Sequence, residues 1–315
     1  MRLLVTRPMT DRATRAIAGR FDATFRDNTR LSEAEASAAL RDYDAIIPTL
    51  GDAFTAAAFA DAPRCRILAN FGAGFNHIDV KAAKAAGVVV TNTPDVVTDA
   101  TADIAVMLML MTTRRASEGE RILRAGDWTG WNPTQLLGGH LSGRTVGIVG
   151  MGRIGQAIAR RCHFGFGMQV VFFNRSTVTG LDFPARQIPQ LEAMLAEADI
   201  AVLAVPGGPG TRHLIGTPQL AALGPQGYLV NIARGDVVDE AAMIEALQSH
   251  AIAGAGLDVY EQEPVVPQAL LDAPNTTLLP HLGTATDDTR TAMGLRALDN
   301  LVAYAEGRAP RDRVN

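Results

Sequence analysis

The chain has 315 residues, of which 47% are hydrophobic, 20% charged and 5% aromatic, and its formal net charge is −4 at pH 7. This length exceeds the ~100–200 residues typical of one domain and predicts two domains, while the composition excludes a disordered or fibrous protein. The small negative charge provides no electrostatic footprint for nucleic acid or an anionic membrane.

Several features favour a cytoplasmic protein. The longest apolar run, residues 104–111, is shorter than the roughly 18 residues of a membrane span. The opening "MRLLVTRP" has too short an apolar stretch for a signal peptide. Cys65 and Cys162 lack the spacing of a metal site or a disulfide framework and are expected to be inert thiols. We therefore expect no metal, no membrane partner and no nucleic-acid partner.

From the N-terminus, short β-rich runs alternate with Ala-rich helical patterns, which predicts a parallel sheet with helices on its faces. Strands are expected at 2–6, 42–49, 65–71 and 87–92, and helices at 31–41 and 79–87. Residues 98–115 then form one predicted long helix, with Asp99 and Asp103 in its first turns and Arg114 and Arg115 at its end, as the helix dipole favours. Its apolar middle suits a core or a subunit interface.

A Gly-rich segment with no predicted element, residues 125–143, holds Trp128 and Trp131. A second alternating series follows and predicts a second α/β domain, with strands at 145–150, 169–174, 199–206, 227–233, 253–259 and 276–280. The final helix, 286–306, is expected to return to the first domain. That domain would then be discontinuous, with hinges near residues 98 and 286.

The stretch "TVGIVGMGRIG" predicts a dinucleotide-binding turn between a strand and a helix. Gly150 would make the tight turn, Gly152 would let the backbone approach a pyrophosphate, and Gly155 would allow the helix to pack closely on the strand. The N–H groups at the helix start would face the phosphates. A plain strand-to-helix turn and a site for S-adenosylmethionine are the alternatives.

Three polar residues follow three predicted strands, where ligands bind in open α/β sheets: Arg234, Glu263 and His281. Taken singly, each is better explained as a solvated surface residue or, for His281, as a residue that ends a strand. Together they suit the reduction of a 2-oxo acid by a nicotinamide. The histidine would supply a proton, the glutamate would stabilise the imidazolium, and the arginine would bind the carboxylate and polarise the carbonyl.

The second strand of the dinucleotide unit ends in "FFNRST", where an acidic residue would hydrogen-bond the 2′-hydroxyl of NAD. Asn174 occupies that position, and the nearest downstream acid, Asp182, lies beyond the turn. Arg175 could pair with a 2′-phosphate, and Ser176 adds a hydroxyl donor. The motif predicts that NADP(H) is preferred, with NAD(H) possible; the alternative is an ordinary loop arginine.

The motifs "VGIVGMGRIG", "NIARGDVVDE", "DVYEQEP" and "LLPHLGTAT", in this order, resemble the D-isomer-specific 2-hydroxyacid dehydrogenases over essentially the whole chain. "FGAGFNHID" and "TDATADIA" resemble the substrate loop and long helix of the glyoxylate/hydroxypyruvate reductases among them. The resemblance implies two doubly wound parallel-sheet domains with a cleft between them. These are a flavodoxin-like substrate-binding domain, 1–98 and 287–315, and a Rossmann-type dinucleotide-binding domain, 99–286.

The resemblance also implies roles by position. Arg234, Glu263 and His281 become the catalytic set. The implied cofactor-binding residues are Thr101, Gly150, Met151, Gly152, Arg153, Ile154, Gly155, Asn174, Arg175, Ser176, Val205, Pro206, Thr211, Ile232, Ala233, Arg234, Asp258, His281 and Gly283. The implied substrate-binding residues are Leu50, Gly72, Ala73, Gly74, Arg234 and His281, together with Trp131 from a partner subunit.

A homodimer is implied as well, with a dimerisation helix and arm at about 99–143; the alternative is that both tryptophans pack on their own subunit. The implied activity is NADPH-dependent reduction of glyoxylate and hydroxypyruvate to D-2-hydroxy acids. Phosphoglycerate and D-lactate dehydrogenases are alternatives within the family. A dinucleotide-sensing corepressor is an alternative from another functional class, because a fold does not determine a function.

Overall fold

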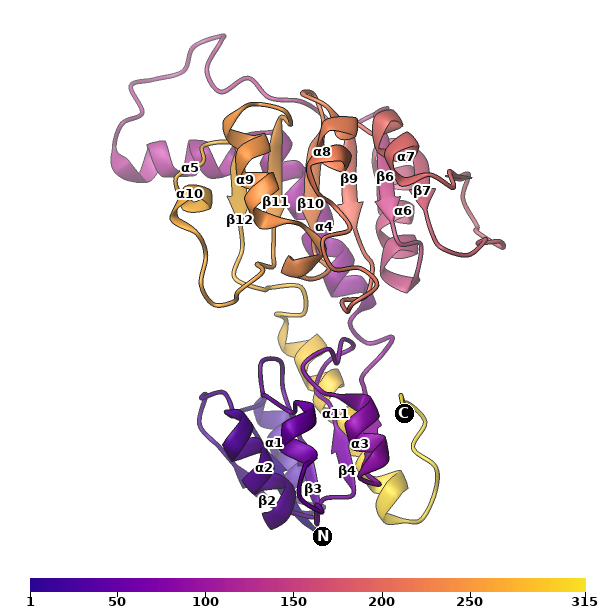
Figure 1. Cartoon of the computed structure of the whole chain (residues 1–315). Coiled ribbons are helices and arrows are strands. Elements are labelled where there is room, and N and C mark those ends of the chain that lie inside the picture. The colour runs from indigo at the N-terminus through magenta and orange to yellow at the C-terminus, as the bar shows by residue number, and fades with distance from the viewer. The chain divides into compact units, whose positions relative to one another are not determined.

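The computed structural model describes residues 1–315, and the chain divides into two compact units. The first comprises Met1–Val97 and Thr284–Asn315, and the second comprises Thr98–Gly283. Each unit holds one parallel sheet with helices on its faces (Figure 1). The predicted fold class of two doubly wound α/β domains is confirmed.

The sheet of the first unit has the strand order β2-β1-β3-β4-β5, which is the flavodoxin-like order. Its strands are β1 (Arg2–Val5), β2 (Asp22–Phe25), β3 (Ala45–Ile47), β4 (Ile67–Ala69) and β5 (Val89–Thr91). Its helices are α1 (Asp11–Ala18), α2 (Glu33–Asp42), the 3-10 helix η1 (Ala56–Phe59), α3 (Val80–Ala85) and α11 (Asp287–Ala305).

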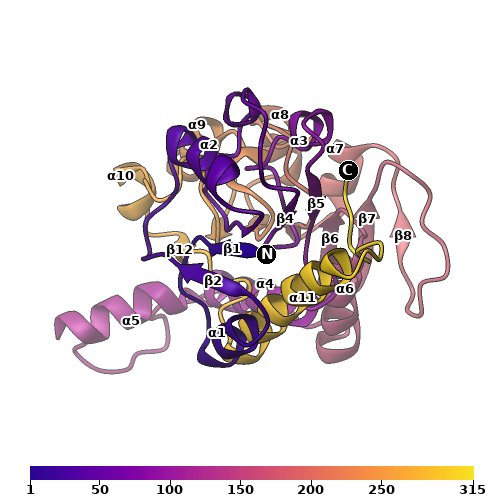
Figure 2. The same ribbon diagram turned by 90° about the horizontal axis from the view of Figure 1, so that it is seen from below.

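The C-terminal helix α11 packs beside α1 at the start of the chain (Figure 2). A Cβ atom at Gly294 would lie only 2.6 Å from the Cβ of Ala13, so a glycine lets the two helices approach closely. The hydroxyl oxygens of Thr10 and Thr291 lie 2.7 Å apart at the same contact. The two ends of the chain therefore share one core.

The sheet of the second unit has the order β12-β11-β10-β9-β6-β7-β8, which is the Rossmann order with one more strand at an edge. Its strands are β6 (Thr145–Val149), β7 (Gln169–Phe173), β8 (Arg186–Gln187), β9 (Ile200–Leu203), β10 (Tyr228–Asn231), β11 (Gly254–Leu257) and β12 (Thr276–Leu278). Its helices are α4 (Thr98–Thr113), α5 (Ala116–Ala125), α6 (Arg153–Phe166), α7 (Leu191–Glu197), α8 (Thr217–Leu223), the 3-10 helix η2 (Gly235–Val237), α9 (Glu240–Gln248) and α10 (Gln268–Leu271).

Apolar side chains of the second unit form a core on each face of the sheet. Helices α4 and α6 cover one face, and α7, α8 and α9 cover the other (Figure 1). The strands between them are buried on both faces, as expected for a parallel sheet. This burial fixes the strand ends, and the loops that leave those ends carry the candidate site.

The predicted helix at 98–115 corresponds to α4, which ends at Thr113. Helix α5 follows at 116–125 and was not predicted, and Arg115, in a left-handed conformation with φ of 53°, lies between the two helices. Helix α5 has no buried residue, and it projects from the unit together with the arm that follows it (Figures 1 and 2). In that arm the side chain of Trp128 is 51% exposed and that of Trp131 is 80% exposed.

Both cysteines are buried, and burial raises the pKa of each thiol, Cys65 and Cys162, to about 12. A thiol with such a pKa is not a nucleophile near neutral pH. None of the helices combines the length and apolar character that crossing a membrane requires.

Candidate active site

Arg234 follows β10 in a turn that Asn231, the last residue of the strand, holds in place. The Asn231 side chain accepts a hydrogen bond from the N–H of Ala233 (3.0 Å) and donates one to the carbonyl of Arg234 (2.9 Å). Burial lowers the pKa of Arg234, and the negative charges of Glu263 and Asp236 oppose that shift. The guanidinium remains charged, and its Nη1 atom donates to the carbonyl of Ala233 at 2.7 Å.

The turn of Arg234 packs tightly against the loop that carries Glu263. A Cβ atom at Gly235 would lie 1.8 Å from the carbonyl carbon of Tyr260, so only a glycine allows this approach. Within the Glu263 loop, the N–H of Tyr260 donates to Oε1 of Glu263 at 3.2 Å. The spacing of the two loops is therefore set by backbone contact.

His281 and Glu263 form a pair at this edge of the sheet, with Nδ1 of His281 2.9 Å from Oε2 of Glu263. Burial opposes ionisation of Glu263, but the hydrogen bond and charge of His281 and the charge of Arg234 outweigh it and hold the pKa of Glu263 below its usual value. A carboxylate can only accept, so Nδ1 donates in this pair. Nε2 is then the ring nitrogen that can exchange a proton with a ligand.

Asp258, which follows β11, holds the segment that carries His281. Its carboxylate accepts hydrogen bonds from the N–H groups of Leu282 (2.6 Å) and Gly283 (2.8 Å), and its carbonyl accepts the N–H of His281 (2.9 Å). His281 has φ of 56°, a left-handed conformation that a non-glycine residue adopts only where its surroundings enforce it. Burial raises the pKa of Asp258, against the effect of these hydrogen bonds.

The glycine-rich turn joins β6 to α6. Gly150 has φ of 100°, and a Cβ atom at Gly155 would lie 2.1 Å from the carbonyl oxygen of Gly150. No side chain caps the N-terminus of α6, its first turn holds no acidic residue, and a Cβ atom at Gly152 would meet no other atom within 4 Å. The uncapped N–H groups beside open space fit the pyrophosphate of a dinucleotide.

The residues Asn174, Arg175 and Ser176 follow β7 at the same edge. The Asn174 side chain donates to the carbonyl (3.0 Å) and the hydroxyl (3.2 Å) of Ser176, so it shapes the turn. Arg175 and Ser176 are exposed. The nearest downstream carboxylate, that of Asp182, pairs with Arg160 of α6.

The other residues predicted to contact the cofactor lie on segments of the second unit near these turns. Thr101 of α4 lies beside Gly283, since a Cβ atom at Gly283 would be 3.6 Å from the Thr101 hydroxyl. In the loop after β9, the hydroxyl of Thr211 donates to the carbonyl of Pro206 at 2.7 Å. Of the remainder, Met151, Ile232 and Ala233 are buried, Ile154 and Val205 are half-buried, and Arg153 is exposed.

In the first unit, the loop of Gly72, Ala73 and Gly74 is held by its carbonyl groups. Asn70 donates to the carbonyls of Gly72 (2.9 Å) and Gly74 (3.0 Å), and Asn92 donates to that of Ala73 (2.8 Å). The N–H groups of Ala73 and Gly74 donate to no acceptor within the protein. Leu50, after β3, is half-buried.

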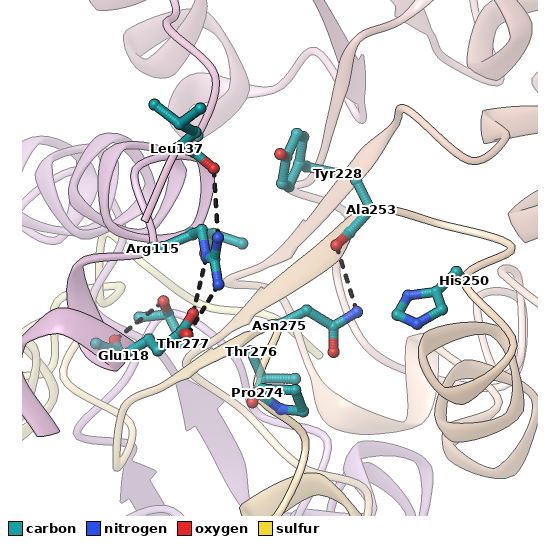
Figure 3. A pocket seen from close by; sticks show the side chains of 13 residues that line it. Arg115, Glu118, Leu137, Tyr228, His250, Ala253, Pro274, Asn275, Thr276 and Thr277 are labelled. Carbon is teal, nitrogen blue, oxygen red and sulfur yellow. Dashed lines mark hydrogen bonds and ion pairs between the residues drawn. The ribbon is translucent and has the colours of Figure 1, made fainter. Parts of the chain in front are cut away.

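A pocket of about 270 Å³ lies at the opposite end of the second unit's strands, near the first residues of β10 and β12 (Figure 3). Arg115 lines the pocket, and its guanidinium donates to both carboxylate oxygens of Glu118 at 2.8 Å and to the carbonyl of Leu137 at 3.5 Å. None of the predicted catalytic or cofactor residues lines this pocket. The candidate reaction site is therefore the edge that holds Arg234, Glu263 and His281.

Asn231 was not foreseen in the sequence, and Asp258 was expected to contact the cofactor rather than to hold the segment that carries His281. Asn231 could have been suspected, because an amide side chain that ends the otherwise apolar strand "YLVN" must find partners in the following turn. The hydrogen bonds of Asp258 had no such signal, since its partners follow another strand and lie far along the chain.

Comparison with known proteins places these features in a family. Residues 106–283 match the family described as D-isomer specific 2-hydroxyacid dehydrogenase, NAD binding domain. The chain is 40% identical to a glyoxylate reductase of Thermococcus onnurineus, over all of this chain and 96% of that protein.

Two solved structures of relatives resemble this chain in both fold and sequence. The NADPH-dependent glyoxylate/hydroxypyruvate reductase of Sinorhizobium meliloti, in complex with NADP and malonate, is 40% identical with a TM-score of 0.89, over 99% of this chain and 96% of that one. A glyoxylate reductase of Paecilomyes thermophila is 32% identical with a TM-score of 0.88, over 100% and 98% of the two chains.

Proposed function

Because this chain belongs to the D-isomer-specific 2-hydroxyacid dehydrogenase family, we propose that it reduces glyoxylate and hydroxypyruvate to D-2-hydroxy acids with NADPH. An NAD(P)-dependent oxidoreductase of the glyoxylate reductase type is what the relatives support. The observation that carries the finer proposal is the His281–Glu263 pair, which lies at the ligand edge of the sheet with Arg234 on the adjoining loop.

The residues that would hold the cofactor are those of the glycine-rich turn, with the Asn174–Ser176 turn at the adenosine end. A bound nicotinamide would supply the hydride that becomes the C–H bond of the product alcohol. The first unit is proposed to bind substrate, with the N–H groups of Ala73 and Gly74 receiving the carboxylate as an anion-binding nest and with Leu50 as an apolar contact.

The roles of the three strand-end residues follow from their chemistry. The Arg234 guanidinium binds the substrate carboxylate and polarises the 2-oxo group, because its planar fork matches two oxygen atoms. His281 gives the proton on Nε2 to the carbonyl oxygen as that oxygen gains negative charge. Glu263 accepts from Nδ1, which fixes the ring orientation and stabilises the imidazolium before transfer.

A panel of 2-oxo acids tests this proposal directly. Glyoxylate, hydroxypyruvate, pyruvate and phosphohydroxypyruvate would each be supplied with NADPH or NADH, and cofactor oxidation would be followed by absorbance. We expect glyoxylate and hydroxypyruvate to be the best substrates. A preference for pyruvate or for the phosphorylated acid would instead indicate a D-lactate or phosphoglycerate enzyme, and no turnover of any member would reject the enzymatic proposal.

Glu263→Gln is expected to leave part of the activity and to lower the pH at which reduction declines. Reduction needs the protonated imidazole, so activity is present at low pH and is lost as the imidazole deprotonates. The Glu263 carboxylate, ionised because its pKa lies below the usual value, favours the protonated form, and glutamine removes that charge. The pH dependence of kcat/KM for glyoxylate measures the change, and an unaltered profile would reject the pairing.

We further propose that the protein is a homodimer formed by α4, α5 and the arm. Leu123, Trp128, Trp131 and Leu137 are all more than half exposed on α5 and the arm of one subunit, and such a group of apolar side chains marks an interaction surface. Trp131 is proposed to reach the partner's site. Sedimentation equilibrium at micromolar concentration should give twice the 33.4 kDa chain mass, whereas a monomer would contradict the proposal.

A further inference from the structure

The segment 174–185, between β7 and β8, carries the proposed 2′-phosphate contacts. Val178 and Leu181 pack on the core of the second unit, and Phe183 is buried, so apolar contacts anchor the later part of the segment. Arg175 and Ser176 lie before these anchors and are exposed. Loops of this length need specific bonds to keep one conformation.

Gln187, in the two-residue strand β8, supplies such bonds. Its Nε2 group donates to the carbonyls of Ser176 (2.9 Å) and Asn174 (3.3 Å), and its Oε1 atom accepts the N–H of Val178 (3.0 Å). Both ends of one amide are thus bonded to the turn, and only a primary amide offers both donor and acceptor in this geometry. β8 itself is held in the sheet by pairing with β7.

Gln187 bonds the carbonyls of Asn174 and Ser176, the two residues that flank Arg175, and does not use the Ser176 hydroxyl. The Ser176 carbonyl is occupied by Gln187 and Asn174, while the Ser176 hydroxyl accepts from Asn174 and can still donate its own hydrogen outward. A Cβ atom at Gly210 would lie 3.8 Å from Nη1 of Arg175, so the guanidinium lies over the loop that follows β9. The Arg175 guanidinium and the Ser176 hydroxyl are therefore two hydrogen-bond donors that follow the end of β7.

We propose that Gln187 is a specificity-determining residue that positions Arg175 and Ser176 to bind the 2′-phosphate of NADPH. It acts through the turn and has no role at the reacting atoms. The inference rests on the proposed preference for NADPH. Its test must therefore distinguish the loss of the three Gln187 hydrogen bonds from a protein that has no preference for NADPH.

The test uses Gln187→Met, which keeps the side-chain length and removes all three hydrogen bonds, and Gln187→Glu, which keeps the acceptor and sets a carboxylate against two carbonyl oxygens. Calorimetry would measure the binding of adenosine 2′,5′-bisphosphate and of ADP. The first probe carries the 2′-phosphate and the second does not. Steady-state kinetics would give kcat/KM for NADPH and NADH.

In Gln187→Met we expect binding of the 2′,5′-bisphosphate to weaken about fivefold or more, since several hydrogen bonds that order the turn are lost. ADP binding should change less than about twofold by the same reasoning. Gln187→Glu should weaken binding of the 2′,5′-bisphosphate at least as much as Gln187→Met does. NADPH kcat/KM should fall through KM, with NADH little changed.

Gln219→Met is the matched control. Gln219 also braces a turn with both ends of its amide, accepting from the N–H of Gly216 at 3.0 Å and donating to Glu192 at 2.8 Å, at the start of α8. Gln219→Met should leave the ratio of the affinities for adenosine 2′,5′-bisphosphate and ADP unchanged.

The outcomes separate the proposed preference for NADPH from the proposed role of Gln187. A wild type that binds both probes equally rejects the NADPH preference and the inference built on it. A wild type that favours the bisphosphate and a Gln187→Met variant that keeps this preference reject the role of Gln187 alone. Equal weakening of both probes would show a general structural role and would also reject it.

Discussion

Replacing His281 by glutamine is expected to abolish most of the reduction of glyoxylate, by a factor of about 10²–10⁴ in kcat, the usual contribution of a positioned proton donor. Glutamine can still accept or donate hydrogen bonds, but it cannot release a proton near neutral pH. The pairing of Nδ1 with Glu263 at 2.9 Å directs the other ring nitrogen to this task. Initial rates at saturating cofactor measure the loss.

His213 offers a matched control for this experiment. Its Nε2 atom lies 2.9 Å from Oε1 of Glu261, and its side chain is 31% exposed, against 30% for His281. It also has a left-handed backbone, with φ of 50°. His213→Gln should therefore lose a comparable contact with a carboxylate yet retain activity within a few-fold. If both variants lose activity equally, or if His281→Gln keeps more than about a tenth of its rate, the role given to His281 is wrong.

The strand ends were predictable because the pattern that marks them is local. Polar residues follow several apolar runs of the second unit, and parallel strands place all of their ends at one edge. From that rule alone Arg234, Glu263 and His281 were expected at one edge of a sheet. The structure adds the 2.9 Å contact between two of them and the close backbone approach at Gly235.

The groups that hold these residues were less predictable because their partners are distant in sequence. Asp258 bonds N–H groups beyond β12, and Gly235 is required by a loop that follows β11. Strand β8 has two residues, too few to show a hydrophobic alternation, yet it carries Gln187. Periodicity identifies elements, whereas such bonds depend on which loops the completed sheet brings together.

Helix α5 escaped prediction for a different reason, although the end of α4 near Arg114 and Arg115 was predicted. Its ten residues hold only two large apolar side chains, Ile122 and Leu123, which is too few to show a helical period. The chain turns through the left-handed Arg115, whose guanidinium binds Glu118 in the first turn of α5.

The second large expected effect concerns the cofactor. The wild type should use NADPH better than NADH, mainly through a lower KM, because no carboxylate follows β7 to repel a 2′-phosphate and Asp182 is paired with Arg160. Arg175 is exposed and lies over Gly210, where its guanidinium can pair with the phosphate and stack on the adenine. The preference should then depend on this one side chain.

Arg175→Ala is therefore expected to reduce the NADPH preference at least about tenfold, since a charge-assisted hydrogen bond contributes about 1.5–3 kcal/mol and 1.4 kcal/mol corresponds to a factor of ten. The comparison is kcat/KM for both cofactors in the wild type and the variant. Arg144→Ala provides the control, because Arg144 precedes β6 at the opposite edge of the sheet and pairs with Asp199 at 3.3 Å. Loss of the arginine charge there should leave the ratio unchanged. If the wild type uses NADH equally well or better, Asn174, Arg175 and Ser176 form an ordinary surface turn, and the adenosine end of the site does not select for a phosphate.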